Sequence, residues 1–465
     1  MKIVGLTAEY NPFHNGHRYH IEQAKKITGA DHAVVVMSGD YVQRGIPACM
    51  PKRLRAEMAL KCGTSAVFEL PVCYATGSAE LFAEGAVSFL DQLGIVDTLV
   101  FGSECNDLES LSQIADLLVE EPELYRTVLR SHLKNGDSYP TARQEAVSAC
   151  LHGTDCSFLL NDPNNILGIE YLKALKRQKS RIIPYTIARR GAHYHDPDLH
   201  DSYSSASAIR SLLAYSGSAV HIDHADQPEY SGIHHILGEL EHQVPESCLE
   251  LLKDHHRIQY PICPNDFSLI LKYKLLNKKP DSLIRYMDVS QELANRICAQ
   301  LNNYFHYQQF CELLKTRELT QTRVNRALLH IMLGIKKKNV AAYTSDHFHY
   351  YAHLLGFRKD SEKVISAAAR HGKLPLLTRL YDAGHLPESG QKMLTQDILA
   401  SNLYTSVVTD KYKQLLKMSI TRGSLKYKVP LVISFTVRSS LSSYKSPPSL
   451  PDRYGMQRSK TTELP

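Results

Sequence analysis

The chain has no apolar run approaching the roughly 20 residues that a membrane-spanning helix needs. Residues 1–6 lead directly into polar residues, so they lack the apolar core and cleavage site of a secretory signal. We therefore expect a soluble, cytoplasmic protein with no membrane partner. The 465 residues are 43% apolar and 22% charged, which is typical of a globular protein with two or three domains.

The ten cysteines form no C-x-x-C pair and have no regular spacing. We expect reduced, mostly buried thiols, because a disulfide framework or a thiolate zinc site needs closer patterning. Residues 254–256 and 346–349 place a carboxylate beside histidines. Immediate neighbours on a helix point to different sides, so neither cluster has the pairing of a helical metal site. The sequence predicts no metal site formed by protein side chains.

A uniform excess of positive charge is also absent. The formal net charge is +6, but residues 411–465 carry 11 Lys and Arg against 2 Asp and Glu, which leaves 43 against 46 in residues 1–410. Net charge therefore gives no argument for RNA binding by the body of the chain. Residues 401–465 are predicted to form a divergent, basic, Ser-rich tail that is partly disordered, with one β-like run over residues 429–437.

Strand-like and helix-like segments alternate over residues 1–235. The predicted strands are residues 2–7, 33–37, 66–70, 98–101 and 182–187. The helices expected between them include residues 15–27, 52–61 and 78–93. Strands separated by helices of this length predict an α/β fold with a doubly wound parallel sheet. Ligands of such sheets bind at the carboxyl ends of the strands.

Between about residues 240 and 400, strand-like runs vanish and helical periodicity dominates. Clear examples are residues 267–276, 290–301 and 323–333. No internal repeat with the period of a solenoid is present. We predict a mainly α-helical second domain over residues 236–400.

The strongest local signal is an H-x-G-H motif, formed by His14, Asn15, Gly16 and His17, that follows the first predicted strand. Pro12 stiffens the connecting loop, and the helix begins near Asn15 or Gly16. The helix N-terminus offers N–H groups and a positive dipole end to phosphate oxygens. Both histidines can donate hydrogen bonds to the same phosphates, and Gly16 lets the backbone approach a nucleotide. The motif predicts a phosphate-binding helix start.

This motif, on the first βα unit, resembles that of the nucleotidyltransferase superfamily, which adenylates small substrates. Residues 204–210 resemble the superfamily's I-S-S-T-x-I-R segment, which contacts ATP phosphates. The resemblance implies that residues 1–235 form a nucleotidyltransferase-like, ATP-binding catalytic domain. It implies His14, His17 and Arg210 as the catalytic residues.

Four further segments resemble the bacterial tRNA(Met) cytidine acetate ligase family; they are residues 38–45, 101–104, 163–171 and 189–196. The resemblance covers roughly residues 1–400. It implies an enzyme that activates acetate with ATP as acetyl-adenylate, releases pyrophosphate, and acetylates N4 of the wobble cytidine of elongator tRNA(Met). The helical domain would then bind the tRNA.

The resemblance also implies ATP contacts along the first loop and helix and at four later positions. The expected contacts are Thr7, Ala8, Glu9, Tyr10, Asn11, Pro12, Phe13, His14, Asn15, Gly16, His17, Arg18, Tyr19, His20, Gly102, Asn165, Arg189 and Ser205. Asn164 and Arg190 remain alternatives to Asn165 and Arg189. In the first step two anions must meet, so His14, His17, Arg210 and Mg²⁺ carried on the phosphates would offset the charge.

The predicted RNA contacts are Arg44, Lys315, Arg317, Arg323 and Arg326. Arg323 and Arg326 lie three residues apart on a predicted helix and could present one basic face to phosphates. Arg44 follows the second predicted strand with Asp40 and Gln43, so it could face the acetate, the phosphates or the RNA.

Two other hypotheses stay open. An adenylyltransferase could act on a small phosphorylated metabolite, although such enzymes do not need a helical domain of about 160 residues. A non-catalytic RNA-binding protein could have kept a nucleotide fold, although intact His14, His17 and Arg210 argue against it. The sequence does not indicate an oligomeric state.

Overall fold

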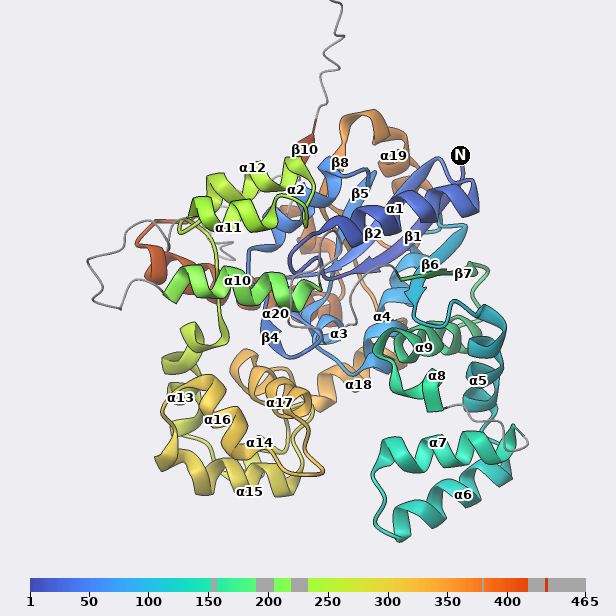
Figure 1. Cartoon of the computed structure of the whole chain (residues 1–465), viewed down its shortest axis with the longest axis vertical. Helices are drawn as coiled ribbons and strands as arrows, with labels where there is room; N and C mark the ends of the chain where they lie inside the picture. The colour runs from blue at the N-terminus through green and yellow to red at the C-terminus, as the bar shows by residue number, and fades with distance from the viewer. Residues whose placement is uncertain (152–156, 190–204, 219–232, 379, 417–430, 434–465) are drawn as a thin grey trace, which may run out of the picture. The chain divides into compact units, whose positions relative to one another are not determined.

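The computed structural model describes residues 1–151, 157–189, 205–218, 233–378, 380–416 and 431–433. Their centre is a β-sheet with the strand order β10-β8-β5-β2-β1-β6-β7, in which β9 also pairs with β8 (Figure 1). The strands are β1 (Ile3–Ala8), β2 (His32–Ser38), β5 (Ala66–Leu70), β6 (Thr98–Ser103), β7 (Ile183–Ala188), β8 (Ala352–Arg358), β9 (Leu376–Leu377) and β10 (Leu431–Ile433).

The predicted parallel sheet is confirmed. β1 pairs in parallel with β2 and β6, and β5 and β7 extend the parallel part on either side. The five strands predicted from residues 1–235 lie within one or two residues of the observed ones. Every residue of β2 and β5 is buried, as expected for strands covered on both faces.

Two layers of helices cover the sheet, because alternate side chains of each strand point to opposite faces. Val34 and Val36 of β2 join one hydrophobic cluster, whereas Val35 and Met37 join the other. One face packs against α1 (Asn15–Thr28), α2 (Lys52–Lys61), α10 (Ala206–Ser218), α11 (Ile233–Leu240) and α12 (Glu246–His255). The other packs against α3 (Val72–Ala75), α4 (Ala79–Gln92), α5 (Leu108–Glu120) and α9 (Pro163–Arg177).

A separate group of helices, α13 to α17, follows α12, and helices predicted at residues 267–276, 290–301 and 323–333 are confirmed within it (Figure 1). Its elements are η1 (Pro264–Phe267), α13 (Ser268–Leu276), α14 (Pro280–Leu283), α15 (Gln291–Gln300), η2 (Leu301–Asn303), α16 (Tyr307–Leu314) and α17 (Gln321–Leu333). The remaining elements are the hairpin β3 (Tyr41–Val42) and β4 (Ile46–Pro47), α6 (Glu123–Lys134), α7 (Tyr139–Cys150), α8 (Ser157–Asn161), α18 (Lys337–Ser345), η3 (Lys359–Ser361), α19 (Glu362–His371), η4 (Leu380–His385) and α20 (Glu388–Tyr412).

Among the helices described, none combines the length and the apolarity needed to cross a bilayer. The nine cysteines within the described residues are all free thiols, and each is buried or partly buried.

We predicted that residues 240–400 contain no strands, and this prediction is wrong, because β8 lies in this range. This strand pairs antiparallel with β5, so the helical part of the chain contributes to the central sheet. Leu354 and Leu355 are buried on opposite faces of the sheet. The segment contains Gly356 and begins between helical runs, so its own pattern is weak, and its pairing with β5 is a long-range property that periodicity cannot detect.

The predicted start of the tail at residue 401 also needs correction, because it falls inside α20. Buried residues of this helix, including Ala400, Tyr404 and Val408, lie on both sides of that position. Part of the predicted β-like run forms β10, which pairs with β8. Met1–Ile433 forms one compact unit, and the division of the chain at residue 235 stays a prediction.

A buried polar network joins α20 to the sheet. One carboxylate oxygen of Asp397 accepts a hydrogen bond from the backbone N–H of Val72 (2.8 Å), and the other accepts one from the Tyr351 hydroxyl (2.5 Å). Burial, and then the charge of Glu69, raise the pKa of Asp397 to about 7. Burial opposes ionisation of Glu69 too, but Lys52 at 2.6 Å and His353 at 2.7 Å hold its pKa at about 2.

The raised pKa of Asp397 predicts a pH-dependent stability. An acid that binds its proton more tightly in the folded state stabilises that state below its unfolded pKa, and the contribution is lost as the pH rises through the folded value. The free energy of unfolding should therefore fall by roughly 1–2 kcal/mol between pH 5 and pH 7. Glu69, with a folded pKa of about 2, is ionised in the folded state throughout this window, so it adds only a small opposing slope near pH 5.

Urea unfolding at a series of pH values tests this prediction, with Asp397→Asn as the comparison. The variant removes the titrating group but keeps hydrogen-bonding atoms, so its stability should depend less on pH than that of the wild type. Equal slopes in the two proteins would contradict the role given to Asp397.

Candidate active site

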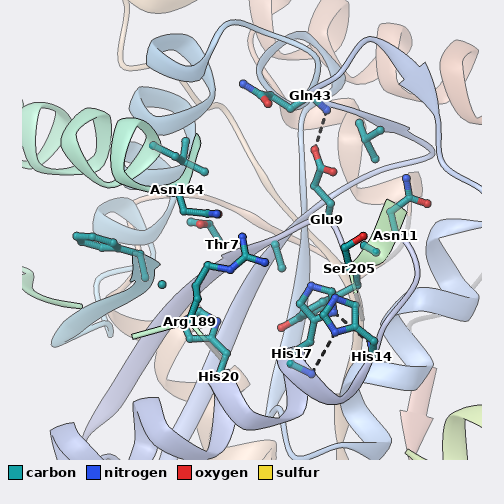
Figure 2. A pocket seen from close by; sticks show the side chains of 18 of the residues that line it. Thr7, Glu9, Asn11, His14, His17, His20, Gln43, Asn164, Arg189 and Ser205 are labelled. Atoms are coloured by element: carbon teal, nitrogen blue, oxygen red, sulfur yellow. Dashed lines mark hydrogen bonds between the residues drawn. The ribbon is translucent and has the colours of Figure 1, made fainter. Parts of the chain in front are cut away.

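A cavity of about 250 Å³ opens at the carboxyl ends of β1, β6 and β7, where the fold predicts a ligand site. Its lining comes from the loop after β1, α1, the β3–β4 hairpin, β6, α9, the end of β7 and the start of α10. Predicted residues in the lining are Thr7, Ala8, Glu9, Tyr10, Asn11, His14, Gly16, His17, Tyr19, His20, Arg44, Gly102, Arg189, Ser205 and Arg210. Figure 2 shows His14, His17, Arg189 and Ser205 pointing into one space.

Some predicted ATP contacts do not line the cavity. Pro12, Phe13, Asn15, Arg18 and Asn165 are absent from its lining. Phe13 is buried in the core behind it, and Asn15 instead donates its backbone N–H to the carbonyl of Gln243 (2.9 Å). Arg190, the alternative to Arg189, lies outside the described residues.

Of Asn164 and Asn165, the structure brings Asn164, which was the alternative, to the cavity. The amide oxygen of Asn165 instead accepts hydrogen bonds from the backbone N–H groups of Glu104 and Cys105 (3.0 and 3.2 Å). Asn165 therefore holds the loop that follows β6. Adjacent residues at a helix start face different directions, and their sequence alone does not tell which one faces the ligand.

His14 and His17 build the start of α1 together. The His14 ring accepts the backbone N–H of Gly16 at Nδ1 (3.1 Å), and the His17 ring accepts that of His14 at Nδ1 (3.2 Å). The ring centroids are 3.8 Å apart. A Cβ at Gly16 would lie 2.9 Å from the His14 ring, so the glycine makes room for this cap. The structure thus gives Gly16 a role beyond access for a ligand.

Both histidines are neutral donors in this arrangement. Since each Nδ1 accepts a hydrogen bond, the proton of each ring resides on Nε2, which can donate. Burial, and then Arg189 and Arg210, lower the pKa of His14 to about 3. Burial and the neighbouring His14 lower the pKa of His17 as well. These side chains are therefore placed to supply hydrogen bonds, whereas the arginines supply charge. That the histidines offset phosphate charge as the transition state forms stays a prediction.

Arg210 and Ser205 belong to a second helix start at the cavity. The Ser205 hydroxyl accepts the backbone N–H of Ala208 (3.0 Å) at the beginning of α10. Arg210 donates to the carbonyl of Asn11 (2.7 Å) and to the Ser207 hydroxyl (2.9 Å), which fixes it against the loop after β1. Two helix N-termini and the guanidinium groups of Arg189 and Arg210 make this end suited to a polyphosphate.

The opposite end of the cavity is apolar and was not predicted. Phe82, Phe101 and Leu167 line it together with Tyr171, whose hydroxyl forms a hydrogen bond with that of Thr7. The rings of Phe101 and Tyr171 lie 5.8 Å apart. These residues come from three different elements (α4, β6 and α9). Phe101, Leu167 and Tyr171 lie in segments that carry the family resemblance, but the sequence did not indicate that they meet in one wall. A paired hydroxyl beside an apolar wall fits a small carboxylate with a short alkyl group.

The chain is similar to proteins of known family. A family model described as HIGH Nucleotidyl Transferase matches residues 1–418. A tRNA(Met) cytidine acetate ligase of Acetivibrio thermocellus is 38% identical over 407 residues, covering 87% of this chain and 94% of the relative. That of Alkaliphilus metalliredigens is 37% identical over 419 residues, covering 88% and 95%. The chain belongs to the tRNA(Met) cytidine acetate ligase family.

Solved structures agree with this assignment. Thermotoga maritima TmcAL in its apo form has a TM-score of 0.82 at 30% identity, covering 94% of this chain and all of that one. The same protein bound with alpha-thio ATP has a TM-score of 0.81, with the same identity and coverage. The predicted family and fold class are confirmed.

The predicted RNA residues are not brought together as one face. Arg326 donates to the carboxylate of Asp288 (3.0 Å) and is mostly buried, whereas Arg323 is exposed, so the two do not form one exposed basic face. The RNA role of Arg326 stays a prediction. Asp288 lies outside the helix, and its contact is invisible to helical spacing. Lys315 and Arg317 are exposed at the end of α16 and beyond it. The RNA role of Lys315, Arg317 and Arg323 stays a prediction.

Arg44 belongs to the hairpin β3–β4, which lies against α17. Gly45 in this hairpin has a φ of +74°, and a Cβ there would overlap the backbone nitrogen of Arg326. The hairpin therefore packs directly on the helix backbone. Gln43 beside Arg44 donates its backbone N–H to the Glu9 carboxylate (2.9 Å; Figure 2). The hairpin thus links the ATP-site loop of this ligase family member to its helical group.

One residue that holds these loops was missed by the sequence analysis. Arg55 on α2 is fully buried, and its guanidinium donates to the backbone carbonyls of Glu9, Ser38, Gly39 and Met50. It thereby joins the loop after β1 to the loop after β2. An arginine within a plain helical segment carries no sequence signal for such a role.

Replacing Arg55 tests the dependence of the cavity on this residue. Arg55→Met removes the guanidinium donors from four backbone carbonyls, and each lost hydrogen bond costs about 1–3 kcal/mol. We expect the free energy of unfolding to drop by about 3 kcal/mol or more in urea denaturation. Arg370→Met, on the exposed surface of α19, is the control and should change it by less than about 0.5 kcal/mol. Similar losses in both variants would refute the role of Arg55.

Proposed function

We propose that this protein is an AMP- and pyrophosphate-forming ligase of the cytoplasm. It activates acetate with ATP and transfers the acetyl group to N4 of the wobble cytidine of elongator tRNA(Met). The main support for this proposal is the cavity. One end of it suits a polyphosphate, and the other is small and apolar and holds the hydroxyls of Thr7 and Tyr171. The names of the relatives and the alpha-thio ATP in the Thermotoga structure support it.

In the first step, an oxygen of acetate attacks the α-phosphorus of ATP, and the bond to pyrophosphate breaks. The neutral rings of His14 and His17 donate hydrogen bonds from Nε2 to phosphate oxygens, while Arg189 and Arg210 contribute positive charge. Donors that are already fixed in place stabilise developing charge without reorganising. His14 is held by its capping bond and Arg210 by Asn11 and Ser207.

Mg²⁺ enters this proposal as a companion of the phosphates. Within the residues described, no group of three or more His, Cys, Asp or Glu side chains could hold a metal ion. Glu9 is the acidic residue in the described part of the cavity lining. Mg²⁺ prefers oxygen ligands and keeps several waters, so phosphate oxygens suit it without a protein cage. When bound, it neutralises charge on the triphosphate.

In the second step, the exocyclic amine of cytidine attacks the acetyl carbonyl carbon, and the bond from that carbon to AMP breaks. This nitrogen is a poor nucleophile, so the driving force comes from the activated acid and the good leaving group. The acetyl group would lie at the apolar end, beside Leu167 and the Tyr171 hydroxyl.

Exchange of labelled pyrophosphate into ATP tests the function directly. Exchange that needs acetate, with or without tRNA, supports the ligase. Exchange that needs a phosphorylated metabolite instead would replace it by the adenylyltransferase hypothesis. Tight tRNA binding without any exchange would leave a non-catalytic RNA-binding protein.

Variants of the histidine pair test the roles within the first step. His14→Ala and His17→Ala should each lower the exchange rate by about 10²-fold, the usual effect of losing one positioned donor. The affinity for tRNA should change less than twofold. His14→Asn keeps a capping oxygen but has no Nε2–H, so it should be stable and still slow. The exposed His347→Ala is the control. Equal losses of exchange and tRNA affinity would assign these histidines to the RNA instead.

Enlarging the apolar end tests the location of the acyl group. Leu167→Ala removes three carbon atoms from the wall. The ratio of kcat/KM for propionate to kcat/KM for acetate should therefore rise by about tenfold. The exchange assay with each acid measures this ratio. Leu160→Ala on α8 makes the same change outside the lining, so it serves as the matched control. An unchanged ratio in Leu167→Ala would move the acyl group elsewhere.

A further inference from the structure

Helix α13 presents an unusual exposed face. Leu269, Tyr273 and Leu276 recur at a spacing that places them on one side of the helix, and they are 79%, 71% and 59% exposed. Leu271 and Leu275 on the opposite side are buried. The helix is thus packed by one face and leaves a stripe of large apolar side chains in solvent.

Phe305, which is 81% exposed, follows Tyr304, a residue held against α13. The hydroxyl of Tyr304 donates to the carbonyl of Ser268 (2.8 Å), and the Lys272 ammonium donates to the carbonyl of Tyr304 (3.2 Å). These bonds hold Tyr304 against the first turns of α13, and Phe305 is the next residue in the chain. We call Leu269, Tyr273, Leu276 and Phe305 the α13 platform.

The helix that carries the platform is basic. Residues 268–279 contain Lys272, Lys274, Lys278 and Lys279 and no acidic residue. Lysines that alternate with exposed aromatic rings are the combination with which proteins hold single-stranded nucleic acids. The rings stack on bases, and the ammonium groups contact phosphates.

We infer that the α13 platform binds unpaired nucleotides of the RNA substrate, with bases stacked on Tyr273 and Phe305. This inference rests on the proposed function, because that function supplies an RNA as substrate. It adds a contact surface separate from the predicted Lys315, Arg317 and Arg323. Apolar contact from Leu269 and Leu276 would extend the stacked surface along the helix.

Charge argues against two other occupants. A symmetric contact with a second copy would bring the same four lysines of each chain together. Residues 411–465 of this chain carry 11 Lys and Arg against 2 Asp and Glu, so their excess charge has the same sign as that of the four lysines. An RNA, with one negative charge per nucleotide, is attracted by it.

Binding of an unmodified elongator tRNA(Met) transcript to the full-length protein tests the inference. Tyr273→Ala combined with Phe305→Ala should raise Kd at fixed salt by at least about tenfold, because each lost stack weakens binding. Tyr273→Phe retains a ring and should bind within twofold of the wild type. Tyr139→Ala, an exposed tyrosine on α7, is the matched control and should leave Kd unchanged.

Two further measurements separate the possible failures. Lys274→Gln with Lys279→Gln should reduce the salt dependence of binding by about two counterions. Acetate-dependent pyrophosphate exchange without tRNA should stay at the wild-type level in all these variants. If the wild-type protein itself shows no such exchange, the proposed function is refuted, whereas the platform is not. Wild-type Kd in the double alanine variant refutes the platform. A self-association by sedimentation that the double variant loses would assign it to a second copy and also overturn the inference.

Discussion

The guanidinium of Arg55 is the interaction on which the candidate site depends. It lies beneath the loops that follow β1 and β2 and donates to backbone carbonyls of both. The first loop leads into the His14 cap, and the second leads into the hairpin that carries Gln43. Because one rigid, permanently charged group satisfies both, the phosphate end of the cavity and the hairpin keep a fixed relation.

The cavity separates hydrogen bonding from charge. The buried histidine pair is neutral and supplies directional donors, whereas Arg189 and Arg210 stay charged and supply the field. Had both rings been protonated, four cations would face one another in the absence of ligand. The reciprocal cap avoids that repulsion, since each Nδ1 is already engaged as an acceptor. The site is thereby preorganised for an anion at little electrostatic cost.

Local features of the structure could be predicted from the sequence. The parallel strands and the H-x-G-H helix start follow from short apolar runs and from a contiguous motif. Features that depend on distant partners could not be obtained in this way. The pairing of Arg326 with Asp288, the position of β8 and the burial that neutralises His14 each arise from residues far away in the chain. Asn165 shows the finer limit, because its neighbour faces the cavity and it does not.

The position of β8 has a consequence for how the chain reaches its native state. Its antiparallel partner β5 lies far upstream, with Glu69 and His353 separated by 284 residues. A ribosome-bound chain therefore exposes the unpaired edge of β5 until most of the protein has been synthesised. Such an edge is a template for wrong pairing. The edge of β5 is therefore covered only after residues 352–358 have been synthesised. A fragment ending at residue 235 would leave this edge unpaired.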